Sequence, residues 1–170
     1  YFLIPNPKEK DPIANIIERF DSRGCERDAR TGGLIVSNTG TRNVAVTTGN
    51  VLCRLTEFSI SAIDTSAAGT FDAYYQNGSG GLTKQYAQTQ WNNSQYDDGS
   101  GTLATLTALT YTSRWYYLMT DGTLAMVYGR TQDLDFADIL DESPPSTVPD
   151  RLGKGGLLIG CVAVTSNKPC

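Results

Sequence analysis

Two groups of aspartates carry the side chains that acid–base chemistry needs, Asp97 and Asp98, and further on Asp133, Asp135 and Asp138. Two carboxyl groups placed across a sugar ring can hydrolyse a glycoside. The first pair, however, lies in a Gly/Ser-rich turn, and the second group lies at the start of a short predicted helix, where aspartates favour the positive end. A general acid also needs a raised pKa, which turn carboxylates rarely have. The sequence therefore predicts no catalytic residue and no enzymatic activity.

Several other kinds of reaction centre are excluded by missing residues. The chain of 170 residues has no histidine, which excludes Ser-His-Asp and Cys-His mechanisms and every metal site built on histidine. The acidic calcium-loop pattern with its closing glutamate is absent. Residues 153–156 lack the spacing of a phosphate-binding loop and precede a predicted strand. We expect neither a metal ion nor a cofactor.

A third group of residues has the chemistry of sugar binding. Tyr75, Trp91 and Tyr96 lie in or near the glycine-rich middle of the chain, and Asn92 and Asn93 add hydrogen-bonding amides. Exposed aromatic faces stack on sugar rings, but aromatic side chains also fill hydrophobic cores. Two interpretations therefore stay open for this group, a carbohydrate-binding surface and core packing.

Charge and composition limit the partners. The formal net charge is −4, so no basic field is present to hold a nucleic-acid backbone. No apolar run approaches the roughly 20 residues of a membrane span. The chain starts at Tyr1 without an initiator methionine, from which we expect a processed product or a piece of a longer chain.

Four cysteines, Cys25, Cys53, Cys161 and Cys170, are present, and none forms a C-x-x-C pair. Four cysteines allow three connectivities, and the sequence does not choose among them. One interpretation is a set of buried and incidental thiols. The other is one or two disulfides in a protein exposed to an oxidising environment.

Residues 1–32 are expected to form an N-terminal arm with a short helix that serves docking or oligomerisation. Asp11 and Pro12 form a favourable helix start. The apolar side chains that follow recur at helical spacing and form one stripe, Ile13, Ile16, Ile17 and Phe20. A helix of about ten residues is marginal alone in water, so the stripe needs a partner surface on the β domain or on neighbouring chains.

Residues 33–170 are expected to form an all-β domain. Short strands recur between turn signals at the spacing of a β sandwich of jelly-roll type, with one minor helix over residues 133–141. We expect Phe136, Ile139 and Leu140 to be the buried stripe of that helix. The most secure element is a hairpin with a two-residue Asp121-Gly122 turn, which pairs Met119 with Leu124. Both of its faces are apolar, so we expect it to lie between two layers.

A resemblance extends this interpretation. The segments that carry it are Thr89-Gln90-Trp91-Asn92-Asn93-Ser94-Gln95-Tyr96-Asp97, Gly101-Thr102-Leu103-Ala104-Thr105-Leu106-Thr107, Arg114-Trp115-Tyr116-Tyr117, Val127-Tyr128-Gly129-Arg130, residues 144–149 and Leu158-Ile159-Gly160-Cys161-Val162-Ala163-Val164. Together, and extended back to Thr31, they resemble a recurring β module of bacteriophage tail-fibre and related virion proteins. The cysteines and the N-terminal arm with its helix depart from that pattern.

The resemblance implies a small β domain displayed on the exterior of a virus particle, commonly as a trimer, in a fibre, spike or receptor-binding tip. Its partners would be sister chains, other virion proteins and a glycan or protein of the host surface. The family has no catalytic motif to transfer to this chain. The alternative is a secreted carbohydrate-binding module that uses exposed aromatic residues; a cellular protein of this kind would be extracellular.

Overall fold

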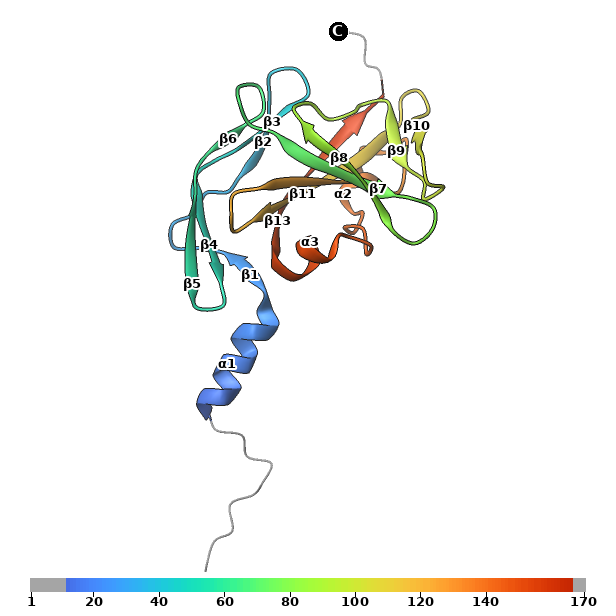
Figure 1. Cartoon of the computed structure of the whole chain (residues 1–170). Coiled ribbons are helices and arrows are strands. Elements are labelled where there is room, and N and C mark those ends of the chain that lie inside the picture. Colours follow the sequence, from blue (N-terminus) through green and yellow to red (C-terminus); the bar gives the residue numbers. More distant parts are fainter. Residues whose placement is uncertain (1–11, 167–170) are drawn as a thin grey trace, which may run out of the picture.

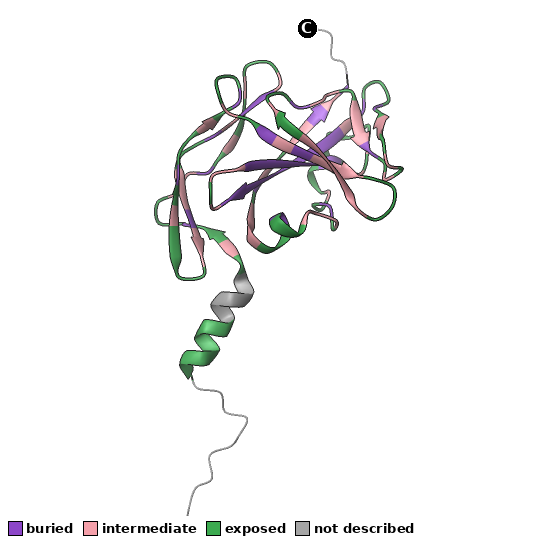
Figure 2. Cartoon of the chain, in the orientation of Figure 1, coloured by how far each residue is buried: buried purple, intermediate pink, exposed green. Residues whose placement is uncertain are grey.

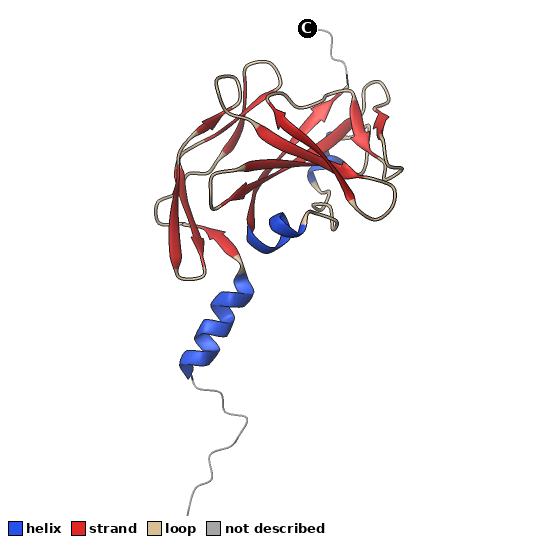
Figure 3. Cartoon of the chain, viewed as in Figure 1, coloured by secondary structure: helices blue, strands red, loops and turns tan. Residues whose placement is uncertain are grey.

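The computed structural model describes residues 12–166, with residues 19–23 described by their backbone alone. The fold is mostly β, as predicted, and strands dominate its body (Figure 3). The largest sheet has five strands in the order β13-β11-β12-β7-β8. Their bounds are β7 Phe71–Gln76, β8 Leu82–Gln88, β11 Tyr111–Met119, β12 Leu124–Tyr128 and β13 Gly156–Thr165.

Smaller sheets and three helices complete the described part of the chain (Figure 1). One three-stranded sheet has the order β1-β4-β5, with β1 Cys25–Arg27, β4 Gly49–Cys53 and β5 Thr56–Ile60. The other has the order β2-β3-β6, with β2 Val36–Thr39, β3 Asn43–Val46 and β6 Ile63–Asp64. A two-stranded sheet pairs β9 Gln95–Asp97 with β10 Leu103–Thr105. The helices are α1 Pro12–Arg23, α2 Phe136–Leu140 and α3 Asp150–Gly155.

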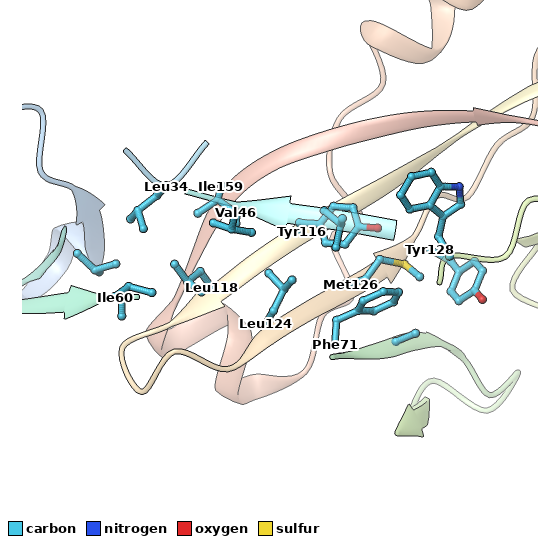
Figure 4. Close-up of a cluster of buried hydrophobic side chains, with 14 of the residues drawn as sticks. Leu34, Val46, Ile60, Phe71, Tyr116, Leu118, Leu124, Met126, Tyr128 and Ile159 are labelled. Atoms are coloured by element: carbon cyan, nitrogen blue, oxygen red, sulfur yellow. The ribbon is translucent and has the colours of Figure 1, made fainter. Parts of the chain in front are cut away.

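The main core lies between one face of the five-stranded sheet and the two three-stranded sheets. Tyr116, Leu118 and Met126 of the hairpin β11–β12 pack there with Val46 of β3 and Ile60 of β5 (Figure 4). A second cluster covers the opposite face of the same hairpin, and it contains Trp115, Tyr117, Met119, Ala125, Val127 and Leu152 of α3. Both faces of the hairpin are therefore buried, as its two apolar faces predicted.

The predicted register of the hairpin is wrong by one residue. Leu118, and not Met119, lies opposite Leu124. The amide N–H of Gly122 donates to the carbonyl of Met119 at 2.9 Å, and Gly122 has a φ of +81°. This is a three-residue loop, a type I turn closed by a left-handed glycine. The predicted type I′ turn would need a positive φ at Asp121 as well, and Asp121 does not have one.

The helices near the C-terminal strand also differ from expectation. Helix α2 is shorter than predicted, and of its expected stripe only Ile139 is buried; Phe136 and Leu140 are 47% and 59% exposed. The three residues share one face of a helix, but α2 is only five residues long, and Phe136 meets the ring of Tyr111 edge to face while Ile139 alone is buried. Helix α3 was not predicted, because its sequence contains two glycines.

Helix α1 extends away from the sheets (Figure 1). Ile13, Ile16 and Ile17 are 65%, 53% and 48% exposed, and the part of α1 whose burial is described is green (Figure 2). The side chain of Phe20 lies outside the described residues. The segment that follows is tied to the β body, since β1 pairs with β4. In the described part of the chain no helix has the length and apolar character needed to cross a membrane.

A disulfide joins Cys25 of β1 to Cys53 of β4, which lie opposite each other in the sheet. This pairing resolves the cysteine alternatives in part: Cys161 is a free thiol, and Cys170 lies outside the described residues. The bond fastens the chain just after α1 to the β body. It therefore fixes where the helix emerges.

Removing this disulfide should destabilise the fold. The bond closes a loop with a sequence separation of 28, for which chain entropy gives about 3–4 kcal/mol. We expect the double variant Cys25→Ser/Cys53→Ser to lose that free energy of unfolding in urea titrations. Cys161→Ser, which removes an exposed free thiol, should change stability by less than about 0.5 kcal/mol. Equal stability of the double variant and the wild type would contradict the expected role of the bond.

Two buried tyrosines make the core sensitive to alkaline pH. Burial raises the pKa of Tyr116 above its ordinary range, although the cation of Arg114 works in the opposite direction. Burial raises the pKa of Tyr128 for the same reason. Both phenols ionise near pH 10 in the unfolded chain and stay neutral in the folded one. Above about pH 10 the folded state holds more protons than the unfolded state, so stability falls as the pH rises.

Tyr116→Phe should weaken that alkaline loss. The Tyr116 hydroxyl is buried without a hydrogen-bond partner in the described structure, so its removal should leave stability at neutral pH unchanged or raise it by about 1 kcal/mol. Above pH 10 the variant should lose about 1.4 kcal/mol less per pH unit than the wild type. Urea titrations at a series of alkaline pH values measure both effects. Parallel pH profiles would show that Tyr116 does not stay neutral in the fold.

Candidate functional site

A polar pocket of about 450 Å³ lies beside strand β8. Its floor is made of buried side chains of β7 and β12, Phe71, Ala73, Met126 and Tyr128. Its polar lining comes from β8, from the segment that follows it and from the loop between β2 and β3, and includes Arg42, Gln85, Gln88, Gln90, Asn92 and Ser94. The volume lies within the range of about 300–1,000 Å³ that is usual for ligand pockets.

A β-bulge places two glutamines of β8 on the pocket side. Gln85 lies opposite Ala73 and Gln88 opposite Phe71, with a register shift between the two pairs. Residues three apart in a regular strand face opposite sides, but the extra residue of a bulge restores a common face. Ala87 within the bulge has a φ of +50°, and its N–H donates to the Asp72 carboxylate at 3.2 Å.

Tyr86, one of the two residues between the glutamines, points outward. It is 70% exposed, and the Lys84 ammonium lies 4.2 Å from the centre of its ring. Lys84 also pairs with Asp72 at 2.7 Å. These contacts hold the outer face of the bulge, while the inner face presents two amides to the pocket.

Arg42 is the cation of the pocket. Its guanidinium donates to Gln90 Oε1 at 3.1 Å and to Asn93 Oδ1 at 3.2 Å, and its carbonyl accepts from the Trp91 N–H at 2.9 Å. Its φ of +61° is in the left-handed region, which costs a residue with a side chain about 1 kcal/mol or more. Backbone strain of this kind is often found at functional sites.

A second arginine, Arg114 of β11, fastens the wall of the pocket from inside. Its side chain is fully buried, and its guanidinium donates to the carbonyls of Asn92 at 2.8 Å and Gln95 at 2.5 Å. The cation lies 4.6 Å from the centre of the Tyr128 ring. Burial lowers the pKa of Arg114 to about 10, which leaves it protonated at neutral pH. Residues 92–95 are thus attached to β11, an inner strand of the five-stranded sheet.

The predicted sugar-binding residues do not form one exposed aromatic platform. Trp91 and Asn92 line the pocket, but Trp91 is only 6% exposed because it packs in the main core. Asn93 lies outside the lining and holds Arg42. Tyr75 is half-buried and meets the ring of Tyr128 edge to face, while the Tyr96 hydroxyl accepts from Gln132 at 3.5 Å outside the pocket.

The aspartate groups hold structure together. Asp97 is buried, and its carboxylate accepts from the backbone N–H groups of Gln76 and Gly99, both at 2.9 Å. Hydrogen bonding from Ser100 lowers the pKa of Asp98, the opposite of what a general acid requires. Asp135 caps α2 by accepting from the Ala137 N–H, as its position predicted. Within residues 12–166 no cluster of three or more Cys, Asp or Glu side chains could hold a metal ion.

The sequence did not predict the polar lining residues Arg42, Gln85, Gln88, Gln90 and Ser94. Arg42 is 48 residues from Gln90 and 51 from Asn93 in the sequence, and it reaches the site through its contacts with them. Gln85 and Gln88 share a face because of the bulge alone, and strand alternation places them on opposite sides. A polar Gln-rich run just before Trp91 was the one available signal.

No protein-family model, no curated protein and no solved structure matches this chain.

Replacing the buried arginine should loosen the wall of the pocket. Arg114→Met removes the donors of three carbonyls, those of Asn92, Gln95 and Ser113, and should destabilise the fold by about 3 kcal/mol. Hydrogen exchange should rise first in residues 92–95. Arg151→Met, at an exposed arginine of α3, should stay within about 0.5 kcal/mol of the wild type. A stable Arg114→Met protein with unchanged exchange would contradict this role.

Proposed function

We propose that the chain is a non-enzymatic virion structural protein, a fibre, spike or decoration domain displayed on the exterior of a virus particle. It assembles as a homotrimer, docks on other virion proteins and contacts the host surface. The observation that carries this proposal is the exposed apolar stripe of α1, on a helix that extends away from the sheets (Figure 1). The occupant we propose for that stripe is the same helix in sister chains.

The stripe supports assembly on energetic grounds. Ile16 and Ile17 are each about half exposed. Burying a large aliphatic side chain stabilises by roughly 1.5–3 kcal/mol, whereas a twelve-residue helix is marginal by itself in water. Packing α1 against its copies gives the helix the apolar partner that it needs. The disulfide at its base keeps the helix and the β body together during assembly.

The β body fits a display role. The hairpin β11–β12 is buried on both faces, which makes the body a rigid support for its loops. A sandwich of jelly-roll type is part of the proposal, and the main core shared between sheets supports it (Figure 4). The parallel pairing of β12 with β7 departs from an all-antiparallel arrangement. The Cys25–Cys53 bond suits an oxidising setting outside the cell.

A second candidate is a secreted carbohydrate-binding module. The pocket beside β8 favours it, because amide groups over an aromatic floor suit the hydroxyls of a sugar. The aromatic platform first expected for this function is not available, since Trp91 is buried. The assembly state separates the two candidates, because the proposed virion domain is a trimer and the second candidate needs no partner chain.

Size-exclusion chromatography with light scattering tests the proposal. The full chain should elute as a trimer at micromolar concentration. Ile16→Ser/Ile17→Ser should shift the protein to a monomer, because the helix loses two apolar side chains that would pack against sister chains. The β circular-dichroism signal should be kept. Ile35→Ser changes an isoleucine of the β body that is 57% exposed, and it should stay trimeric. A wild-type monomer at this concentration, or turnover of a substrate by the pure chain, would reject the proposal.

A further inference from the structure

The charge of the pocket is not neutralised from within. Its lining contains Arg42 and no carboxylate. The side-chain partners of Arg42 are neutral amides, and in the ion pairs formed within residues 12–166 this arginine does not take part. A cation in the lining of a polar pocket attracts an anionic group, and a guanidinium suits a carboxylate because its planar N–H groups match the two oxygens.

The glutamines of the bulge have hydrogen-bonding atoms to spare. Gln85 Oε1 accepts from the Tyr128 hydroxyl at 3.3 Å, and Gln88 Nε2 donates to the Tyr86 carbonyl at 2.7 Å. Within the described residues, no hydrogen bond uses Gln85 Nε2 or Gln88 Oε1. One free amide donor and one free carbonyl acceptor therefore lie on the same face, which is the combination that pairs with sugar hydroxyls.

We infer that this pocket binds an acidic saccharide: the sugar carboxylate pairs with Arg42, and its hydroxyls bond to the side chains of Gln85 and Gln88. A sulfate or phosphate group would be expected to meet several cations, whereas the lining of this pocket contains a single cation, Arg42. A neutral sugar would leave the guanidinium without a charged partner. The ligand class is thus a uronic or sialic acid, the groups that place one carboxylate beside several hydroxyls.

The bulge and the strained backbone of Arg42 fit this role. Ala87 and Arg42 both have left-handed φ values, +50° and +61°, although both carry side chains. Each places polar groups at the pocket: the bulge aligns the two glutamines, and the turn at Arg42 aims the guanidinium at Gln90 and Asn93. Strain kept at two positions around one pocket supports a binding site over incidental surface.

This inference rests on the proposed contact with the host surface, but it does not require the trimer. Its test is a glycan array printed with sialylated, uronic-acid-containing and neutral oligosaccharides, probed with the full chain. We expect signals on acidic glycans that weaken as salt is added, because the pair with Arg42 is screened. Binding of the best acidic probe is then measured by titration against its methyl ester, which lacks the negative charge.

Three variants complete the test. Arg42→Asn should lower affinity for the acidic probe about 10- to 100-fold, and asparagine tolerates the left-handed φ at this position. Gln88→Ala should lower this affinity several-fold and leaves the charge of Arg42 in place. This variant tests the site if Arg42→Asn does not fold. Arg151→Gln makes the same change in net charge on α3 and should bind like the wild type.

A blank array, equal binding of the acid and its methyl ester, or full binding by Arg42→Asn would each overturn the inference. Light scattering on the same samples separates this failure from failure of the proposed function. A trimer that binds no acidic glycan would reject the proposed ligand and leave the proposed display role standing. A monomer that binds acidic glycans through Arg42 would support the proposed ligand and reject the proposed virion assembly.

Discussion

The buried guanidinium of Arg114 is the interaction on which the central part of the fold depends. It lies on β11, between β13 and β12 in the five-stranded sheet, and its hydrogen bonds reach carbonyls of the segment 92–95 that crosses from β8 to β9. Hydrogen bonds from a charged donor are among the stronger ones in a protein interior. The carbonyls and the face of Tyr128 take the place of a carboxylate partner. A charge buried in this way tolerates little movement, because each lost contact leaves it unsolvated.

That constraint extends to the pocket. Asn92 lines the pocket, and its carbonyl accepts a hydrogen bond from Arg114. Tyr128 forms part of the pocket floor, packs against the same cation and donates to Gln85. The buried Arg114 therefore positions the wall at residues 92–95, while Arg42 contributes a cation to the lining. A ligand would meet a surface that is already fixed, which lowers the entropic cost of binding.

The two ends of the molecule have different physical characters. The β body buries the hairpin β11–β12 on both sides and closes its N-terminal edge with the Cys25–Cys53 bond. The helix α1 beyond that bond leaves isoleucines in contact with water (Figure 2). Exposed apolar residues on a short amphipathic helix favour association with a second surface. On the proposed function, the helix would serve assembly and the β body would serve recognition.

The sequence by itself determined the elements whose signals are local. Periodicity and turn residues gave the mostly β class, the helix of α1 with its apolar stripe, the hairpin with two apolar faces and the capping role of Asp135. The register of that hairpin was missed by one residue, because Asp121-Gly122 fits two turn types with different backbone angles. Only the tertiary structure decided which cysteines pair, where Trp91 lies and which side chains share the pocket. Those outcomes depend on contacts between distant segments and on a bulge that reverses strand alternation, and neither leaves a local pattern in the chain.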